Sequence, residues 1–227
     1  EEVVTSTTVY LGESGNILEE KPENCRVIKV VNPILTSTGM LKLKKMHISG
    51  FKVAVIPILY YKNTRLDKAI KRLFLAADRA YNEGANILIL SDRGVDENHL
   101  AIPSLLAVSA LHQHLVDTKR RTSLSLVLES GEPREVHHFA TLLGYGVTAI
   151  NPYMAEETIH ELIHDDLLDK DFYAAVSDYN DAVALTNELE QLARAVDIPT
   201  MVRLMKRIVP EFKSQNSQYE EFDKEVK

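Results

Sequence analysis

The 227-residue sequence contains a single cysteine, and this scarcity excludes several kinds of site. Cys25 cannot form a disulfide within the chain, and one thiolate cannot hold a cysteine-ligated cluster or a four-cysteine zinc site. No feature of the neighbouring sequence would activate this thiol. We therefore expect Cys25 to be a structural or incidental residue.

An excess of positive charge and long apolar runs are also absent. Lys and Arg total 26 against 33 Asp and Glu, which gives a formal net charge of −7. An acidic surface gains nothing from a nucleic-acid backbone or an anionic membrane, so we expect neither as a partner. The longest apolar runs, around residues 86–90, are far too short to span a membrane. No basic start followed by an apolar stretch and a small-residue cleavage site is present, which predicts a cytoplasmic chain.

The usual nucleotide-binding and nucleophile signatures are missing, but one metal-binding pattern is present. The sequence contains no G-x-G-x-x-G, no P-loop and no serine in a nucleophile elbow. His160 and His164 are the first and last residues of the pattern HELIH. On a helix this pattern places the two imidazoles on one face, where they can bind zinc, and the glutamate can act as a general base. No third histidine follows at the extended spacing. A solvated helix with two surface histidines is therefore favoured over a zinc hydrolase.

From Phe51 onward, short apolar strands alternate regularly with amphipathic helices. Strands separated by helices of about 10–15 residues indicate right-handed crossovers and a parallel sheet. The pattern predicts an α/β fold of parallel βα repeats, either a partial or complete TIM-like barrel or an open doubly wound sheet. The expected strands cover residues 51–60, 87–90, 123–128 and 147–150, and the helices between them begin near Leu66, Pro103 and Glu132.

The chain divides into three parts by composition. Residues 1–50 carry turn signals and two short apolar segments, and we interpret them as an N-terminal arm or linker rather than a core unit. Residues 51–211 form the expected α/β domain, which ends in helices over 172–196 and 201–209. Residues 212–227 are polar and are expected to be a frayed tail.

Polar residues follow three of the predicted strands. In parallel α/β folds the working groups collect at the carboxyl ends of the strands, so these residues are expected to meet at one rim. They could bind a small polar ligand or contact another domain, or they could simply cap the following helices. The rim candidates are Ser91, Asp92, Arg93, Glu129, Ser130, Glu132, Arg134, Asn151 and Tyr153.

Four stretches are more distinctive than these patterns. They are LGESGNIL at 11–18, ILILSDRG at 87–94, AIPSLLAVSALHQHL at 101–115 and LVLESGEPREVHHFATLLGYGVTAINPY at 126–153. Together they resemble the central domain of the glutamate synthase large subunit, and the similarity covers about residues 9–165.

The resemblance implies a function. Glutamate synthases make glutamate from glutamine and 2-oxoglutarate: an amidotransferase domain releases ammonia, and a barrel domain with FMN and an iron–sulfur cluster reduces the 2-iminoglutarate. The family's central domain lies between the two, carries no flavin and helps line the ammonia tunnel. By this resemblance we expect a non-catalytic scaffold with no cofactor or metal of its own. Its expected partners are the amidotransferase and FMN-binding domains, and the rim residues are candidates for tunnel or interdomain contacts.

The chain also departs from a whole synthase. Cys25 lies too far inside to act as an N-terminal nucleophile, and the glycine-rich flavin loops are absent. Two interpretations remain: an excised central domain or a divergent stand-alone relative. A stand-alone α/β-barrel enzyme acting on a small molecule at the rim is the main alternative function.

Overall fold

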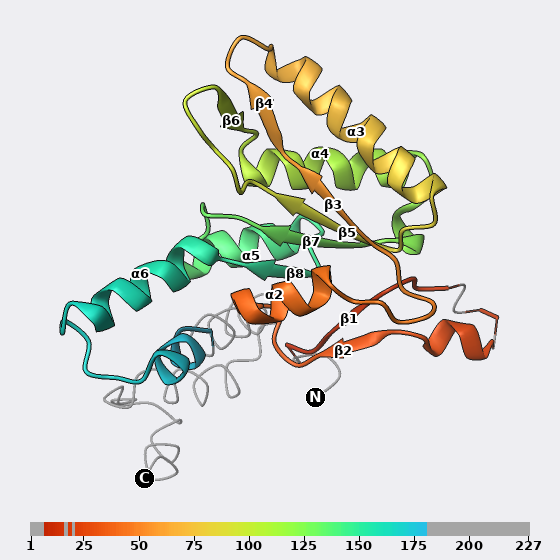
Figure 1. The fold of residues 1–227 in the computed structure, drawn as a ribbon. Coiled ribbons are helices and arrows are strands. Elements are labelled where there is room, and N and C mark those ends of the chain that lie inside the picture. The colour runs from red at the N-terminus through yellow and green to blue at the C-terminus, as the bar shows by residue number, and fades with distance from the viewer. Residues whose placement is uncertain (1–6, 16–17, 20, 181–227) are drawn as a thin grey trace, which may run out of the picture.

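A four-stranded parallel sheet forms the centre of the fold (Figure 1). The structure is a computed structural model that describes residues 7–15, 18–19 and 21–180. Its strand order is β3-β5-β7-β8, and every neighbouring pair is parallel. The strands are β3 (Val53–Pro57), β5 (Ile87–Ser91), β7 (Ser125–Glu129) and β8 (Ala149–Asn151). Every residue of β5, β7 and β8 is buried, because both faces of the sheet are covered.

Three helices cover one face of this sheet. They are α3 (Leu66–Asn82), α4 (Ser104–Asp117) and α5 (Val136–Gly144). The helix α3 shows why they dock, since its buried residues Ala69, Leu73, Ala77 and Ala80 recur every three or four positions and form one apolar stripe. With alternate residues of the strands, such as Leu88 and Leu126, these stripes form the larger hydrophobic core.

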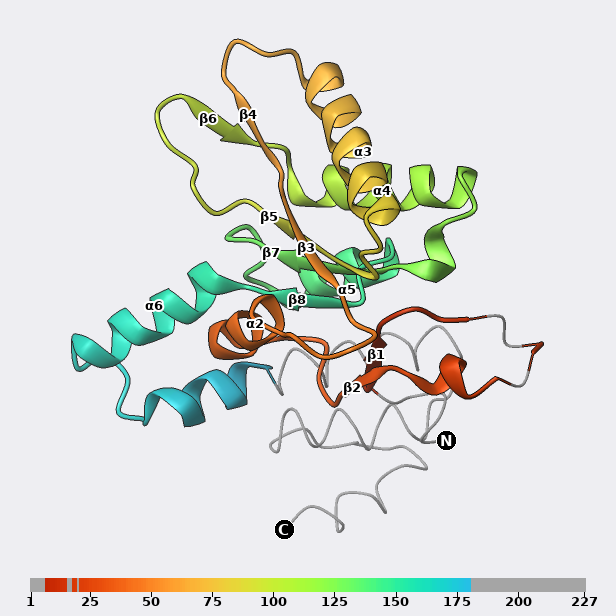
Figure 2. The same ribbon diagram turned by 45° about the vertical axis from the view of Figure 1, so that its right-hand side comes forward.

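The N-terminal region covers the opposite face (Figure 2). It contains β1 (Val9–Leu11), the 3-10 turn η1 (Pro22–Cys25), β2 (Ile28–Val30), which pairs antiparallel with β1, and α2 (Ser37–Lys44). Leu11, Met40 and Leu43 are buried and form a second core with the sheet residues that face them. The interpretation of residues 1–50 as an arm outside the core is thus wrong for this part, because its apolar side chains complete the burial of the sheet.

The same region also extends the edge of the sheet. Ile34 forms a parallel bridge with Ile150. The Leu35 N–H donates to the Ile150 carbonyl at 2.7 Å, and the Ile150 N–H donates to the Pro33 carbonyl at 2.8 Å. Residues 33–35 therefore run alongside β8 and satisfy its outer backbone groups.

Two short strands stand beyond the carboxyl ends of the sheet. The predicted strand over 51–60 is divided at Ile58 into β3 and β4 (Leu59–Tyr61). The strand β4 pairs antiparallel with β6 (His99–Ala101), which lies between β5 and α4 in the chain. The remaining elements are the 3-10 turn η2 (Arg121–Ser123), α6 (Tyr153–His164) and a helical stretch over 172–180.

The α/β class with parallel βα repeats is confirmed. Within the described residues the sheet is open, with four parallel strands, so this part of the chain does not close into a complete barrel. The helices expected beyond residue 180, and the polar tail at 212–227, lie outside the described residues. In that same described part, no helix is long and apolar enough to cross a membrane.

Candidate functional site

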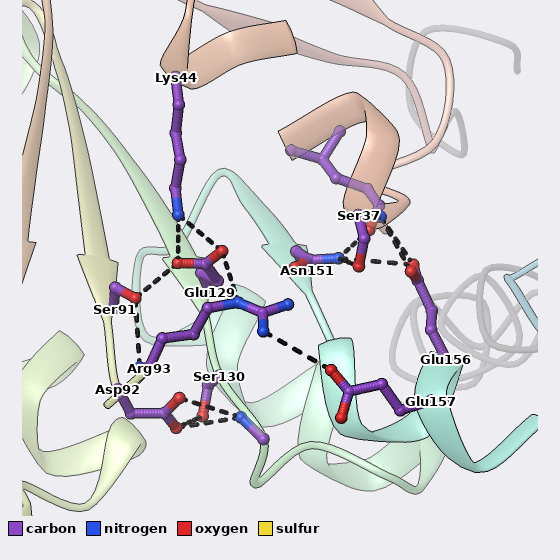
Figure 3. A network of polar contacts seen from close by, with 12 residues as sticks. Ser37, Lys44, Ser91, Asp92, Arg93, Glu129, Ser130, Asn151, Glu156 and Glu157 are labelled. Atoms are coloured by element: carbon purple, nitrogen blue, oxygen red, sulfur yellow. Dashed lines mark hydrogen bonds and ion pairs between the residues drawn. The ribbon is translucent and has the colours of Figure 1, made fainter. Parts of the chain in front are cut away.

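The predicted rim exists, and most of its members meet there (Figure 3). The carboxyl ends of β5, β7 and β8 bring together polar side chains that are at most 5% exposed. We call this set the strand-end cluster: Ser91, Asp92, Glu129, Ser130 and Asn151. Parallel pairing places Ser91 opposite Glu129 and Glu129 opposite Asn151, so register alone aligns these positions.

Glu129 is the centre of the cluster. The Lys44 ammonium, from α2, lies 2.7 and 2.6 Å from its two carboxylate oxygens. The Ser91 hydroxyl donates to Oε2 at 2.5 Å, and the Arg93 Nε–H donates to Oε1 at 3.0 Å. Both oxygens are therefore occupied by groups of the chain itself.

These contacts decide the charge of Glu129. Burial disfavours the carboxylate and acts to raise its pKa, but the hydrogen bonds and positive charge of Lys44, with Ser91 and Arg93, outweigh that effect. The net result is a pKa below the ordinary value of a glutamate. Glu129 is accordingly a carboxylate at neutral pH and is poorly suited to act as a general base.

Arg93 connects the cluster to α6. Its guanidinium carbon lies 3.9 Å from the centre of the Tyr153 ring, and its Nη1 lies 3.6 Å from a Glu157 carboxylate oxygen. The stacked, three-sided arrangement holds the planar guanidinium in one orientation. Its positive charge is compensated by Glu129 and Glu157, and 41% of the side chain remains exposed.

Asp92 organises the turn that follows β7. The Ser130 hydroxyl donates to Oδ2 of Asp92 at 2.5 Å, and the Gly131 N–H donates to the same oxygen at 3.0 Å. Burial, followed by a hydrogen bond with Asp92, raises the pKa of the Tyr153 hydroxyl. Tyr153 is therefore a neutral hydrogen-bond donor in this position rather than an acid or base.

Two of the rim candidates do not join this network. Glu132 accepts hydrogen bonds from the Ser104 N–H at 2.9 Å and the Ser104 hydroxyl at 2.5 Å, so it caps α4, the preceding helix, and not α5, which follows it in the chain. The Arg134 guanidinium forms no hydrogen bond or ion pair with any residue that the structure describes. Its place next to the rim in the sequence therefore does not bring the Arg134 guanidinium into the network around Glu129.

A second polar group joins β8 to α2. The buried Glu156 carboxylate accepts the Ser37 N–H at 2.9 Å, at the first residue of α2. Asn151 donates through Nδ2 to the Leu35 carbonyl at 2.9 Å. Burial raises the pKa of Glu156 despite these bonds. The Oδ1 atom of Asn151 is buried and has no hydrogen-bond partner among the described residues.

Sequence reasoning missed Lys44, Glu156 and Glu157. Lys44 is 85 positions from Glu129, and no spacing rule connects them. A signal was available for Glu156, because an acidic residue in the first turn of a helix is a common capping group, although here it caps a different helix.

The HELIH histidines lie apart from the cluster, on α6. His160 and His164 are exposed; the first packs edge-on against the Phe172 ring, and the second lies 3.2 Å from an Asp165 carboxylate oxygen. Over the described part of the chain, no three His, Cys, Asp or Glu side chains are grouped to hold a metal ion.

Comparison with known proteins identifies the family. The family model described as "Glutamate synthase central domain" matches residues 1–196. The chain is 42% identical over 183 residues to the glutamate synthase [NADPH] large chain of Bacillus subtilis, covering 81% of this chain and 12% of that protein. It is 39% identical over 173 residues to the glutamate synthase [NADH] of Schizosaccharomyces pombe, covering 74% and 8%.

The chain is also similar to a plant glutamate synthase that is named for ferredoxin and not for NADPH or NADH. The chain is 38% identical over 165 residues to the ferredoxin-dependent glutamate synthase 1 of Arabidopsis thaliana, covering 71% of this chain and 10% of that protein. The chain thus spans about a tenth of the length of the relatives that it matches. The matched residues include all the elements of the parallel sheet and the strand-end cluster. The chain belongs to the glutamate synthase central domain family.

Proposed function

We propose that this domain is a non-catalytic scaffold within a larger glutamate synthase polypeptide. In that role it lies between a glutamine amidotransferase domain and an FMN-binding synthase domain and helps to form the passage for ammonia. The whole polypeptide would make glutamate from glutamine and 2-oxoglutarate in the cytoplasm. The similarity to much longer glutamate synthases supports the setting, since each relative has about ten times the length of the matched segment.

The occupied strand-end cluster carries the non-catalytic part of this proposal. Ligands of parallel α/β sheets bind outside the carboxyl ends of the strands. Here Lys44 from α2 reaches into that position and, with Ser91 and Arg93, takes both oxygens of Glu129. Lys44 and Arg93 balance the charge of Glu129, so these groups stabilise the packing of α2 and α6 against the rim instead of binding a substrate.

The paired charges also suit a passage for a small neutral molecule. An unpaired charge inside a dry passage would cost several kcal/mol, whereas paired charges and neutral amides tolerate burial. The Asn151 Oδ1 atom is a buried acceptor without a partner among the described residues. An N–H of ammonia is one donor that this atom could accept.

The cofactors of the proposed enzyme belong to its other domains. An iron–sulfur cluster needs several thiolates, and this chain offers only Cys25, which is exposed. The residues present therefore do not fit a cluster. We place the cluster and FMN in the synthase domain.

The proposal is tested in the full-length polypeptide by measuring how tightly glutamine hydrolysis is coupled to glutamate synthesis. We expect Arg93→Ala to raise the ammonia released to solvent per glutamine hydrolysed, because the rim that positions α2 and α6 is loosened. Synthesis of glutamate from added ammonia should be retained. Arg72→Ala, a change to an exposed arginine of α3, is the matched control and should leave the coupling unchanged. Unchanged coupling in a correctly folded Arg93→Ala enzyme would count against a role of this rim in ammonia transfer.

A further inference from the structure

A cavity of about 560 Å³ lies at the end of the molecule opposite the strand-end cluster. It is formed where the amino ends of β3 and β5 meet the connection between β1 and β2 (Figure 1). We call it the amino-end cavity. Its walls include Glu13, Arg26, Gly50, Lys52, Gly84 and Asn86.

Two cationic side chains that line this cavity have hydrogen-bond donors that the described residues do not use. The Arg26 side chain lies across Gly50, close enough that a Cβ there would be 2.5 Å from its Cδ and 2.9 Å from its Nη1. No carboxylate or carbonyl of the described residues is hydrogen-bonded to the Arg26 guanidinium. Lys52 donates one N–H to the Glu83 carbonyl at 2.5 Å, which leaves two ammonium hydrogens for another acceptor.

Two glycines line the cavity together with these cationic side chains. Gly50 and Gly84 both have a φ of +90°, a conformation that other L-residues rarely adopt. A Cβ at Gly84 would meet nothing within 4 Å, so the space beside this glycine is open. The Asn86 side chain holds two backbone segments of the cavity wall together, because it accepts the backbone N–H of Lys52 at 3.0 Å and donates to the Gly50 carbonyl at 2.8 Å.

The local charge is opposite to that of the chain. The whole sequence has a formal net charge of −7, yet two cations and one carboxylate, Glu13, line this cavity. Arginine and lysine side chains on glycine-lined backbone are the usual receptors of carboxylate and phosphate oxygens. We propose that the amino-end cavity binds a small oxyanion between Arg26 and Lys52. Its position away from the rim makes this inference independent of the proposed scaffold function.

The inference is tested by calorimetric titration of the 227-residue chain with inorganic phosphate and, separately, with malonate, at ionic strength matched with sodium chloride. We expect saturable binding of at least one of these anions at a single site. Arg26→Ala and Lys52→Met should each weaken it at least about tenfold, since each removes a charge-assisted hydrogen bond. Glu13→Gln should tighten binding because it removes the one negative charge from the walls.

Lys62→Ala provides the matched control, since Lys62 is an exposed cation just after β4, beyond the opposite end of the sheet. The anion affinity of the Lys62→Ala variant should equal that of the unaltered chain. Preference for phosphate over malonate, or the reverse, identifies the class of oxyanion. No saturable heat with either anion overturns the proposal. So does binding that is equally strong in the Arg26→Ala, Lys52→Met and Lys62→Ala variants, each with a native circular dichroism spectrum.

Discussion

Glu129 shows at the residue scale how a charge can be buried at the end of a strand. Its side chain is only 4% exposed, so its carboxylate has lost nearly all of its hydration. Hydrogen bonds from Lys44, Ser91 and Arg93 replace that hydration, and two of these donors carry positive charge. Removing one member of such a group leaves the others unsatisfied, which costs more than the isolated interaction is worth.

We therefore predict that Glu129→Gln destabilises the chain by about 2–4 kcal/mol. The amide keeps the size of the side chain but leaves Lys44 and Arg93 beside a neutral group that cannot accept all their hydrogen bonds. Urea unfolding followed by circular dichroism measures the change. Asp67→Asn removes one partner of the exposed Arg65–Asp67 pair and should change the free energy of unfolding by less than about 0.5 kcal/mol. Equal effects of the two substitutions would contradict the buried network.

The lowered pKa of Glu129 predicts a pH dependence of the same quantity. A carboxyl group whose pKa is lower in the folded state contributes stability above its unfolded pKa, about 4.3 for glutamate. That contribution is lost as the pH falls through the lower, folded-state value. The difference in unfolding free energy between the native chain and Glu129→Gln should be largest near pH 7 and shrink below about pH 4. A difference that grows on acidification would show that the pKa is raised instead.

At the scale of elements, α2 is a component of the core and not part of a lead-in arm. Its residue Met40 is 1% exposed and packs against the sheet, whereas Leu41 beside it is 49% exposed. We predict that Met40→Ala lowers the free energy of unfolding by about 2–4 kcal/mol because it leaves a cavity in the second core. Leu41→Ala, on the same helix, should cost less than about 1 kcal/mol. If Met40→Ala and Leu41→Ala both change the free energy of unfolding in urea by similar small amounts, α2 is only loosely attached to the sheet.

The elements that sequence reasoning predicted are those whose pattern is long or strongly apolar. The parallel strands are apolar runs, and the seventeen-residue helix α3 shows repeated apolar spacing, so local chemistry determines them. The helix α2 has eight residues and the strand β6 three, and neither is long enough to show a period. Tertiary contacts stabilise both: the Glu156 carboxylate accepts the Ser37 N–H at the start of α2, in addition to the local cap by Thr36, and β4 pairs with β6.

The same distinction applies to the candidate site. Ser91, Glu129 and Asn151 could be predicted as neighbours, because parallel strands align their carboxyl ends. Lys44 could not, because its approach to Glu129 depends on how the N-terminal region folds back over the sheet. Arg134 was predicted from its nearness in sequence to this rim, but its guanidinium forms no ion pair within the described chain.

At the scale of the whole molecule, the central sheet separates two hydrophobic cores, and its two ends carry different polar groups. The carboxyl end is filled by the strand-end cluster with its partners Lys44 and Arg93, and the amino end contains the open cavity lined by Arg26 and Lys52. A filled rim suits a domain whose task is to hold others in place. We therefore propose that this domain acts as a part of a much longer synthase.

The size of the native polypeptide distinguishes a domain of a longer synthase from a stand-alone protein. We would raise an antibody against the 227-residue chain and measure the immunoreactive band in cells that express it naturally. We expect a band several times larger than 25.6 kDa, because the glutamate synthases that this chain matches are about ten times longer than the matched segment. A band near 25.6 kDa would contradict this proposal and make the chain a stand-alone relative.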